Sequence, residues 1–266
     1  MTAAPGVDAV IFDWGGTLTP WHRIELFEQW QAYATAYDPE RSDELAAALL
    51  VAEEDTWRAG REHHRSGTLD EIFRGCGVDP TGDRHERALA AYYAFWDPHT
   101  HLDPDAPALL DGLRSRGIRV GVLSNTLWTR EHHEEIFARD EILDRIDGAV
   151  YSSEIPYTKP HPESYLAAMR SVDVVDASRC VFVGDRLFED VYGPQELGMR
   201  AVLVPHSEIP DYQRGHTEAE PDAVIQRLGD LLAVVDGWRT VERSETQGAA
   251  AGPVGSSRDH EGSRSS

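Results

Sequence analysis

The sequence predicts an α/β fold, with a doubly wound parallel sheet and an α-helical cap inserted after its first strand. Two observations predict this fold. Beyond residue 99, short apolar runs typical of buried strands alternate with helical patterns, which indicates a parallel sheet with helices on both faces. Residues 21–98 show helical spacing only, and they lie between the first apolar run and the later ones. We therefore expect the helical block to be an insertion into the sheet domain.

The first strand is expected at Ala9–Phe12, an apolar run bounded by turn signals. It ends at Asp13, and Gly15 and Gly16 follow. A carboxylate beside a glycine-bearing turn suits a ligand site at the carboxyl edge of a parallel sheet. Aspartate and glycine are equally common in ordinary polar turns, so this stretch alone leaves both interpretations open.

The helical block contains apolar residues at steps of three and four, for example Phe27, Trp30 and Tyr33. Thr68 and Glu71 have the spacing of a capping box at a helix start. We expect helices over residues 21–38, 43–59, 69–75 and 83–96. Most aromatic residues here should be core, and one or two of Trp30, Trp57, Tyr92 and Trp96 should line a substrate pocket.

The second half of the chain should complete a Rossmann-like core. We expect strands over 118–123, 148–151, 180–183 and 200–204, and helices over 106–116, 128–139, 163–172, 189–197 and 221–235. The predicted domains are a core of residues 1–20 and 99–240 and a cap of residues 21–98. Residues 241–266 are almost without apolar side chains and are expected to be a disordered tail.

The composition narrows the possible partners. The chain of 266 residues carries 47 acidic and 25 basic residues, for a net charge of −22. Nucleic acid and an anionic membrane surface are unlikely partners for such a chain, because both would repel it. No apolar run is long enough to span a bilayer, and the amino terminus lacks signal-peptide features. Two cysteines imply no disulfide framework, so we expect a cytoplasmic protein of undetermined oligomeric state.

Polar residues follow several of the predicted strands. Asp13 follows the first strand, Ser124 and Asn125 the second, and Asp185 a later one. Lys159, the only lysine of the chain, precedes a helix. If these residues converge at one sheet edge, the carboxylates need a cation between them, and oxygen ligands of this kind suit Mg²⁺. The hydroxyl, amide and lysine could hold a phosphoryl group.

Four short motifs follow one another along the chain: Phe12–Leu18, Gly121–Asn125, Lys159–Glu163 and Val183–Asp190. In this order they resemble the motifs of the haloacid dehalogenase-like hydrolases, a superfamily made mostly of phosphatases. The resemblance covers about residues 7–205 and implies a magnesium-dependent hydrolase acting on a small phosphorylated metabolite. It implies that Asp13 is the nucleophile that forms an aspartyl-phosphate, while Ser124 and Lys159 hold the phosphoryl group.

The resemblance also implies a metal site. Its ligands would be Asp13, Asp185, the backbone carbonyl of Gly15 and, directly or through water, Asp190. Asn125 and Arg186 are candidates for substrate binding. Ordinary structural roles compete with these assignments: Ser124 and Asn125 could cap a helix, Asp190 could be a charge favoured by a helix dipole, and Arg186 could be solvated.

One departure from the family pattern concerns Gly15. The phosphatases of the superfamily carry a second aspartate at this position, which protonates the leaving group and then activates water. Acid–base catalysis of this kind contributes about 10²- to 10⁴-fold in rate. Its loss leaves two alternatives open: a haloacid dehalogenase-like displacement, and a catalytically impaired binding or regulatory protein. Substrates with good leaving groups, such as acyl phosphates, would suffer least.

Overall fold

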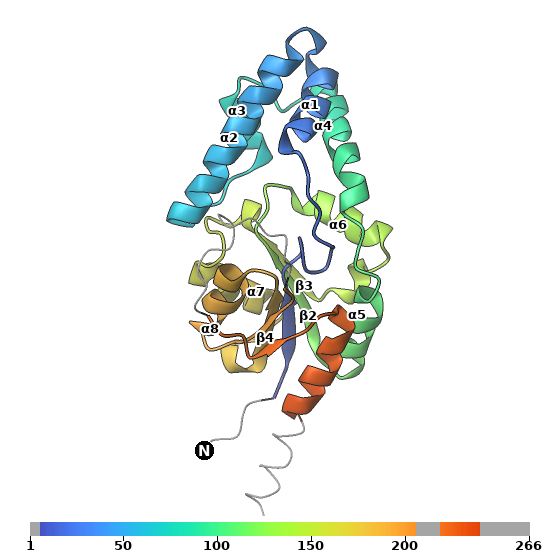
Figure 1. The fold of residues 1–266 in the computed structure, drawn as a ribbon, viewed down its shortest axis with the longest axis vertical. Helices are drawn as coiled ribbons and strands as arrows, with labels where there is room; N and C mark the ends of the chain where they lie inside the picture. Colours follow the sequence, from blue (N-terminus) through green and yellow to red (C-terminus); the bar gives the residue numbers. More distant parts are fainter. Residues whose placement is uncertain (1–5, 206–218, 240–266) are drawn as a thin grey trace, which may run out of the picture.

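The computed structural model describes residues 6–205 and 219–239 (Figure 1). Within these residues, six strands form one sheet in the order β3-β2-β1-β4-β5-β6, and every neighbouring pair is parallel. The strands are β1 (Ala9–Phe12), β2 (Arg119–Ser124), β3 (Gly148–Tyr151), β4 (Cys180–Gly184), β5 (Arg200–Leu203) and β6 (Ala223–Val224). The α/β fold class with a parallel sheet is confirmed.

Helices cover both faces of the sheet because alternate side chains of its strands point to opposite sides. Phe12 belongs to one apolar cluster together with Leu113, whereas Ile11 belongs to a second cluster together with Tyr165. The core helices are α5 (Ala106–Ser115), α6 (Arg130–Arg139), α7 (Pro162–Ser171) and α8 (Gly193–Gln195). Short 3₁₀ turns lie at Pro39–Arg41, Asp97–His99, Leu143–Arg145, Ser152–Glu154, Ala177–Arg179 and Leu228–Asp230.

The inserted cap stands at the end of the molecule beyond the carboxyl ends of the strands (Figure 1). It consists of α1 (Leu26–Tyr37), α2 (Ser42–His63), α3 (Leu69–Gly75) and α4 (Asp83–Trp96). Its centre is aromatic, with Trp30, Phe73 and Tyr92 almost fully buried. The capping box is present: Thr68 Oγ1 accepts from Glu71 N–H at 3.2 Å, and the Glu71 carboxylate accepts from Thr68 N–H at 3.0 Å.

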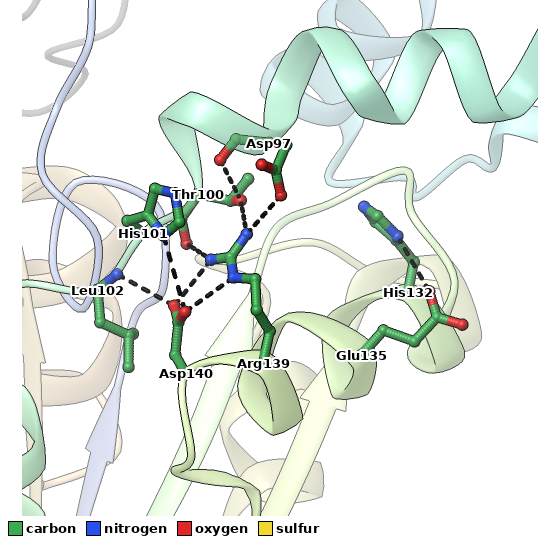
Figure 2. A network of polar contacts seen from close by, with 8 residues as sticks. All are labelled: Asp97, Thr100, His101, Leu102, His132, Glu135, Arg139 and Asp140. Carbon is green, nitrogen blue, oxygen red and sulfur yellow. Dashed lines mark hydrogen bonds and ion pairs between the residues drawn. The ribbon is translucent and has the colours of Figure 1, made fainter.

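The connection from α4 back to the core is fixed by Arg139 of α6 (Figure 2). Its guanidinium donates to Asp97 Oδ1 at 2.8 Å and to the Thr100 carbonyl oxygen at 3.0 Å. Beside it, Asp140 accepts from Arg139 Nε at 2.8 Å and from Leu102 N–H at 3.2 Å. These contacts tie the cap-to-core connection to a core helix and thereby set how the cap stands over the sheet edge.

Three of the predicted helices are wrong in extent. The first begins at Leu26, and residues 21–25 are an irregular connection. Instead of one helix over 221–235, residues 223–224 pair with β5 and only residues 231–239 are helical, because the edge of β5 offers backbone partners that a helix cannot use. The segment predicted as a helix over 189–197 is a π-helical turn at Leu187–Tyr192 followed by the short α8.

Some predictions stay untested. The domain limits at residues 20 and 98 stay predictions, and the proposed tail of residues 241–266 lies outside the described residues. In the described ranges, no helix is long and apolar enough to cross a membrane. Cys76 and Cys180 are both free thiols.

Candidate active site

Three polar side chains come together because their strands are neighbours in the sheet. Asp13 follows β1, Ser124 ends β2 and Asp185 follows β4, and β1 lies between the other two strands. The backbone N–H of Asp13 donates to the Val183 carbonyl oxygen at 2.9 Å, which extends the β1–β4 ladder to the carboxylate itself. Because the carboxyl ends of parallel strands lie at one edge of the sheet, the strand order is enough to place these three residues close together.

Lys159 links the carboxylates of this edge. Its buried ammonium donates to Asp13 Oδ1 and to Asp190 Oδ1, both at 2.7 Å. Burial disfavours the charged ammonium, but the neighbouring carboxylates of Asp13 and Asp190 outweigh this effect and raise the pKa of Lys159. Lys159 therefore stays protonated and holds a positive charge next to the carboxylate of Asp13.

Asn125 contacts the main chain of Lys159 with both ends of its amide. Its Oδ1 accepts from Lys159 N–H at 2.8 Å, and its Nδ2 donates to the Lys159 carbonyl oxygen at 3.2 Å. The side chain thus positions the lysine segment beside the end of β2. Asn125 also lines the cleft described below, and its predicted contact with substrate stays a prediction.

The carboxylates of Asp13, Asp185 and Asp190 form a buried acidic group whose ligand oxygens lie within 4.8 Å of one another. Both oxygens of Asp185 are buried and make no hydrogen bond. Burial raises the pKa of Asp185 well above its usual range. A Cβ at Gly16 would lie 2.6 Å from Asp185 Oδ2, so the glycine leaves the space that this carboxylate occupies. Unsatisfied carboxylate oxygens in such a cluster fit a hard divalent cation.

Asp190 differs from Asp185 because both of its oxygens have protein partners. Oδ1 accepts from Lys159, and Oδ2 accepts from the backbone N–H of Arg186 at 2.9 Å. The Arg186 guanidinium lies 4.7 Å from the centroid of a Trp21 ring, and its Nε is 3.2 Å from Asp185 Oδ2. Arg186 therefore lies inside the site; whether it touches substrate stays a prediction.

Gly15 has no structural need to be glycine. Among the described residues, no atom beyond its chain neighbours lies within 4 Å of the Cβ that a side chain would add there. Its backbone is also outside the left-handed region, unlike that of Gly16 at φ 89°. A Cβ at position 15 would therefore meet no clash and would need no change of backbone conformation. The expected loss of an acid–base group at this position stays a prediction. The predicted role of the Gly15 carbonyl as a metal ligand stays a prediction.

A cleft of about 1100 Å³ separates the sheet edge from the cap. From the core it is lined by Asp13, Ser124, Lys159 and Arg186 among others. From the cap it is lined by aromatic and charged side chains, which include Glu53, Trp57, Arg58, Arg61, Tyr92 and Trp96. We expected one or two cap aromatics to line a pocket, whereas Trp57, Tyr92 and Trp96 all do, and Trp30 is core.

Sequence reasoning missed several of these lining residues. Glu53, Arg58 and Arg61 are unremarkable charges of a helix, and Trp128 lies in a core loop where no motif marks it. For α2 the sequence signal is helical spacing: Glu53, Trp57 and Arg61 follow one another at steps of four residues, which places them on one face of the helix. This spacing does not mark Arg58 or Trp128. Within the described ranges, Asp13, Asp185 and Asp190 are the one set of three or more potential ligands close enough to hold a metal ion, and no histidine belongs to it.

The fold and this site define a known class of protein. A family model of haloacid dehalogenase-like hydrolases matches residues 7–198, and the chain belongs to this family. It is an enzyme of the hydrolase class.

Two similar curated proteins match over nearly their whole length. The chain is 28% identical over 235 residues to a glyceraldehyde 3-phosphate phosphatase of Methanopyrus kandleri, covering 86% of this chain and 97% of the relative. It is 27% identical to a ribulose-1,5-bisphosphate 5-phosphatase of Halopiger xanaduensis, covering 85% and 98% of the two chains.

Solved structures show the same fold. A phosphatase of this superfamily from Thermococcus onnurineus superposes with a TM-score of 0.60 at 23% identity, covering 87% of this chain and 99% of the other. An L-2-haloacid dehalogenase from Xanthobacter autotrophicus gives a TM-score of 0.58 at 22% identity, covering 87% and 99%. At such identities the likeness concerns the fold alone.

Proposed function

We propose that this enzyme is a phosphatase that acts on a small phosphorylated metabolite through an aspartyl-phosphate on Asp13, with Mg²⁺ at the acidic group. The observation that carries the proposal is the pairing of Asp13 with Lys159 at 2.7 Å beside the hydrogen-bond-free oxygens of Asp185. Two relatives that match over nearly their whole length are named as phosphatases, which supports the proposal. The acidic group supports it as well, because a carbon–halogen displacement would not need it.

In this mechanism an oxygen of Asp13 attacks the phosphorus atom, and the bond from phosphorus to the leaving oxygen breaks. Lys159 lowers the charge repulsion between the carboxylate and the incoming phosphoryl group. Ser124, at the end of β2 and on the cleft wall, is placed to donate to a phosphoryl oxygen. When bound, Mg²⁺ would be held by Asp13 and Asp185 and would supply electrostatic stabilisation of the phosphoryl charge. Water then hydrolyses the aspartyl-phosphate.

Gly15 cannot give a proton to the leaving oxygen. An acid–base group is worth about 10²- to 10⁴-fold in rate, which corresponds to roughly 3–5 kcal/mol of barrier. Substrates whose leaving groups are stable as anions are therefore favoured, and acyl phosphates are the leading class. A cytoplasmic location, and a small molecule as the partner instead of nucleic acid or a membrane, belong to this proposal.

The test is phosphate release from a panel with and without Mg²⁺. The panel should hold an acyl phosphate, an aryl phosphate, glyceraldehyde 3-phosphate and ribulose 1,5-bisphosphate. Wild type should release phosphate, and Asp13→Asn should be at least about 10³-fold slower. Gly15→Asp should gain on poor leaving groups because its carboxyl group could protonate them, and the added Cβ meets no clash.

Two outcomes would redirect the proposal. If only Gly15→Asp is active, the scaffold is competent and the natural chemistry is not ester hydrolysis. If all three proteins release no phosphate, one of the two alternatives takes its place. Halide release from a 2-haloacid by wild type would favour the dehalogenase alternative, and binding of phosphate esters without turnover would favour the binding alternative.

A further inference from the structure

The cap wall of the cleft contains a buried carboxylate that the phosphoryl chemistry does not use. Glu53 of α2 is 5% exposed and lines the cleft. Its Oε2 accepts from Gln29 Nε2 and from Trp30 Nε1, both at 2.7 Å, and its Oε1 accepts from Trp57 Nε1 at 3.4 Å. Within the described ranges, these neutral N–H groups are its partners and no basic side chain pairs with it.

The geometry of α2 sets how far Glu53 lies from the nucleophile. Glu53, Trp57 and Gly60 are spaced by four and three residues, so they share one face of the helix. At the far end of this face, the Gly60 carbonyl accepts from Thr158 Oγ1 at 3.4 Å, and Thr158 precedes Lys159. Glu53 is about two helical turns, or roughly 10 Å, farther up the helix. This is too far for proton exchange at Asp13 and suits the remote end of a substrate.

Aromatic rings surround the same part of the cleft. Trp57, Tyr92, Trp96 and Trp128 all line it. Their indole N–H groups are used within the protein: Trp57 donates to Glu53, Trp96 donates to Gln29 Oε1 at 2.7 Å, and Trp128 donates to Tyr92 Oη at 3.1 Å. These indoles can therefore offer a ligand their carbon rings and no hydrogen-bond donor.

A carboxylate without a cation, next to aromatic rings without free donors, matches the chemistry that recognises organic ammonium groups. An anionic ligand beside Glu53 would meet its charge and would find the indole N–H groups of Trp57, Trp96 and Trp128 already engaged. The indole N–H groups of this cleft that have no hydrogen-bond partner among the described residues belong to Trp14 and Trp21, outside this group of rings. The competing feature is a set of arginines that also line the cleft: Arg61, four residues after Trp57 on α2, together with Arg58 and Arg23. Arg58 is 54% exposed and forms an ion pair with Asp55, so it belongs to the outer rim.

We propose that Glu53 and the rings of Trp57, Tyr92, Trp96 and Trp128 form a subsite for an organic ammonium group. The preferred substrate then carries a phosphoryl group at one end and an ammonium group at the other. Its phosphoryl group lies at Asp13 and its ammonium group lies against the cap wall. The substrate class rests on the proposed phosphatase function, whereas the ammonium subsite can be tested without any turnover.

The binding test uses tetramethylammonium, followed by the change in tryptophan fluorescence on titration. Wild type and Asp13→Asn should show saturable binding, with tert-butanol, a neutral molecule of similar shape, binding at least about tenfold more weakly. Glu53→Gln should lose at least about tenfold in tetramethylammonium affinity. Glu62→Gln, which removes an exposed charge from the same helix outside the cleft, is the matched control and should bind as wild type does.

A second variant keeps the test decisive if Glu53→Gln folds poorly. Trp57→Leu removes a ring and leaves the bonds from Trp30 and Gln29 to Glu53 in place. It should also weaken tetramethylammonium binding. The proposal is overturned if Glu53→Gln and Glu62→Gln bind the ammonium equally, or if wild type binds tert-butanol as tightly.

The turnover test compares phosphate esters of one chain length that end in an ammonium, a methyl or a carboxylate group. In wild type, kcat/KM should fall in that order, and Glu53→Gln should remove the preference for ammonium over methyl. A preference for the carboxylate ester would assign the remote site to the cleft-lining arginines and overturn the proposal. If neither these esters nor an acyl phosphate is hydrolysed but tetramethylammonium binding depends on Glu53, the phosphatase function fails and the ammonium subsite stands.

Discussion

The core and the cap each bury carboxylates at the cleft, but they compensate the negative charge in different ways. In the core, Asp13 and Asp190 share the ammonium of Lys159 at 2.7 Å, and Asp185 keeps hydrogen-bond-free oxygens beside them. In the cap, Glu53 is held by the N–H groups of neutral side chains. The core therefore contains a permanent cation and a place for another, whereas the cap leaves its charge for a ligand to balance.

The largest effect should come from removing the core cation. Lys159→Gln leaves Asp13 and Asp190 buried beside each other without their shared ammonium. Breaking a buried ion pair from one side typically costs about 3–5 kcal/mol. Urea unfolding in the absence of divalent metal should show a loss of this size. A loss below about 1 kcal/mol would mean that the carboxylates take up protons easily and that the core does not depend on Lys159.

Metal binding should stabilise the core by the next largest amount. At a Mg²⁺ concentration of 100 Kd, mass action predicts about 2.7 kcal/mol of added stability, because the unfolded chain does not hold the acidic group together. Asp185→Asn should abolish this gain in a thermal unfolding experiment, and Glu53→Gln should retain it. An equal gain in Asp185→Asn would place the metal elsewhere.

As the pH falls, the contact between cap and core should be weakened before the core is. Burial lowers the pKa of His132, which stacks on Tyr93 of the cap at 3.5 Å between ring centroids, to about 4. Burial lowers the pKa of His133, which stacks on Tyr151 of β3, to about 3. Both groups bind protons more readily when the chain unfolds, so their contribution to stability is complete above pH 6.5 and is lost as pH falls towards these values.

The expected slope is up to about 1.4 kcal/mol of stability per pH unit for each histidine below pH 6.5. His132→Gln should reduce the slope measured by urea unfolding between pH 6 and 4. Because His132 titrates at the higher pH, NMR signals of Tyr93 should change before those of Tyr151. Simultaneous changes at both rings would show that cap and core respond as one unit.

The smallest effect is expected at the cap carboxylate itself. Glu53→Gln keeps an oxygen for Gln29 and Trp30 and places an amide against the long bond from Trp57. A loss of about 1 kcal/mol or less is therefore expected by urea unfolding. If the loss instead approaches that of Lys159→Gln, Glu53 is as essential to the cap fold as the lysine is to the core, and the contrast between the two regions disappears.

The gathering of polar residues at one sheet edge was largely predictable from the sequence because short-range patterns specify it. Asp13, Ser124 and Asp185 each follow an apolar strand, and the topology of a parallel sheet then brings them together. The helix predicted over 221–235 was wrong for the opposite reason. Its first residues pair with β5, and a local pattern contains no information about a free edge formed by a distant strand.

The sequence by itself determined the fold class, the inserted cap and the residues at the sheet edge, because strand and helix periods and strand-end residues are local properties of the chain. Only the tertiary structure decided which face of α2 meets the cleft. That choice depends on contacts such as the one between Gly60 and Thr158, which are 98 residues apart. It places Glu53 and its aromatic neighbours on the wall of the cleft that Asp13 also lines, since docking of two elements is set by packing and not by the pattern of either one.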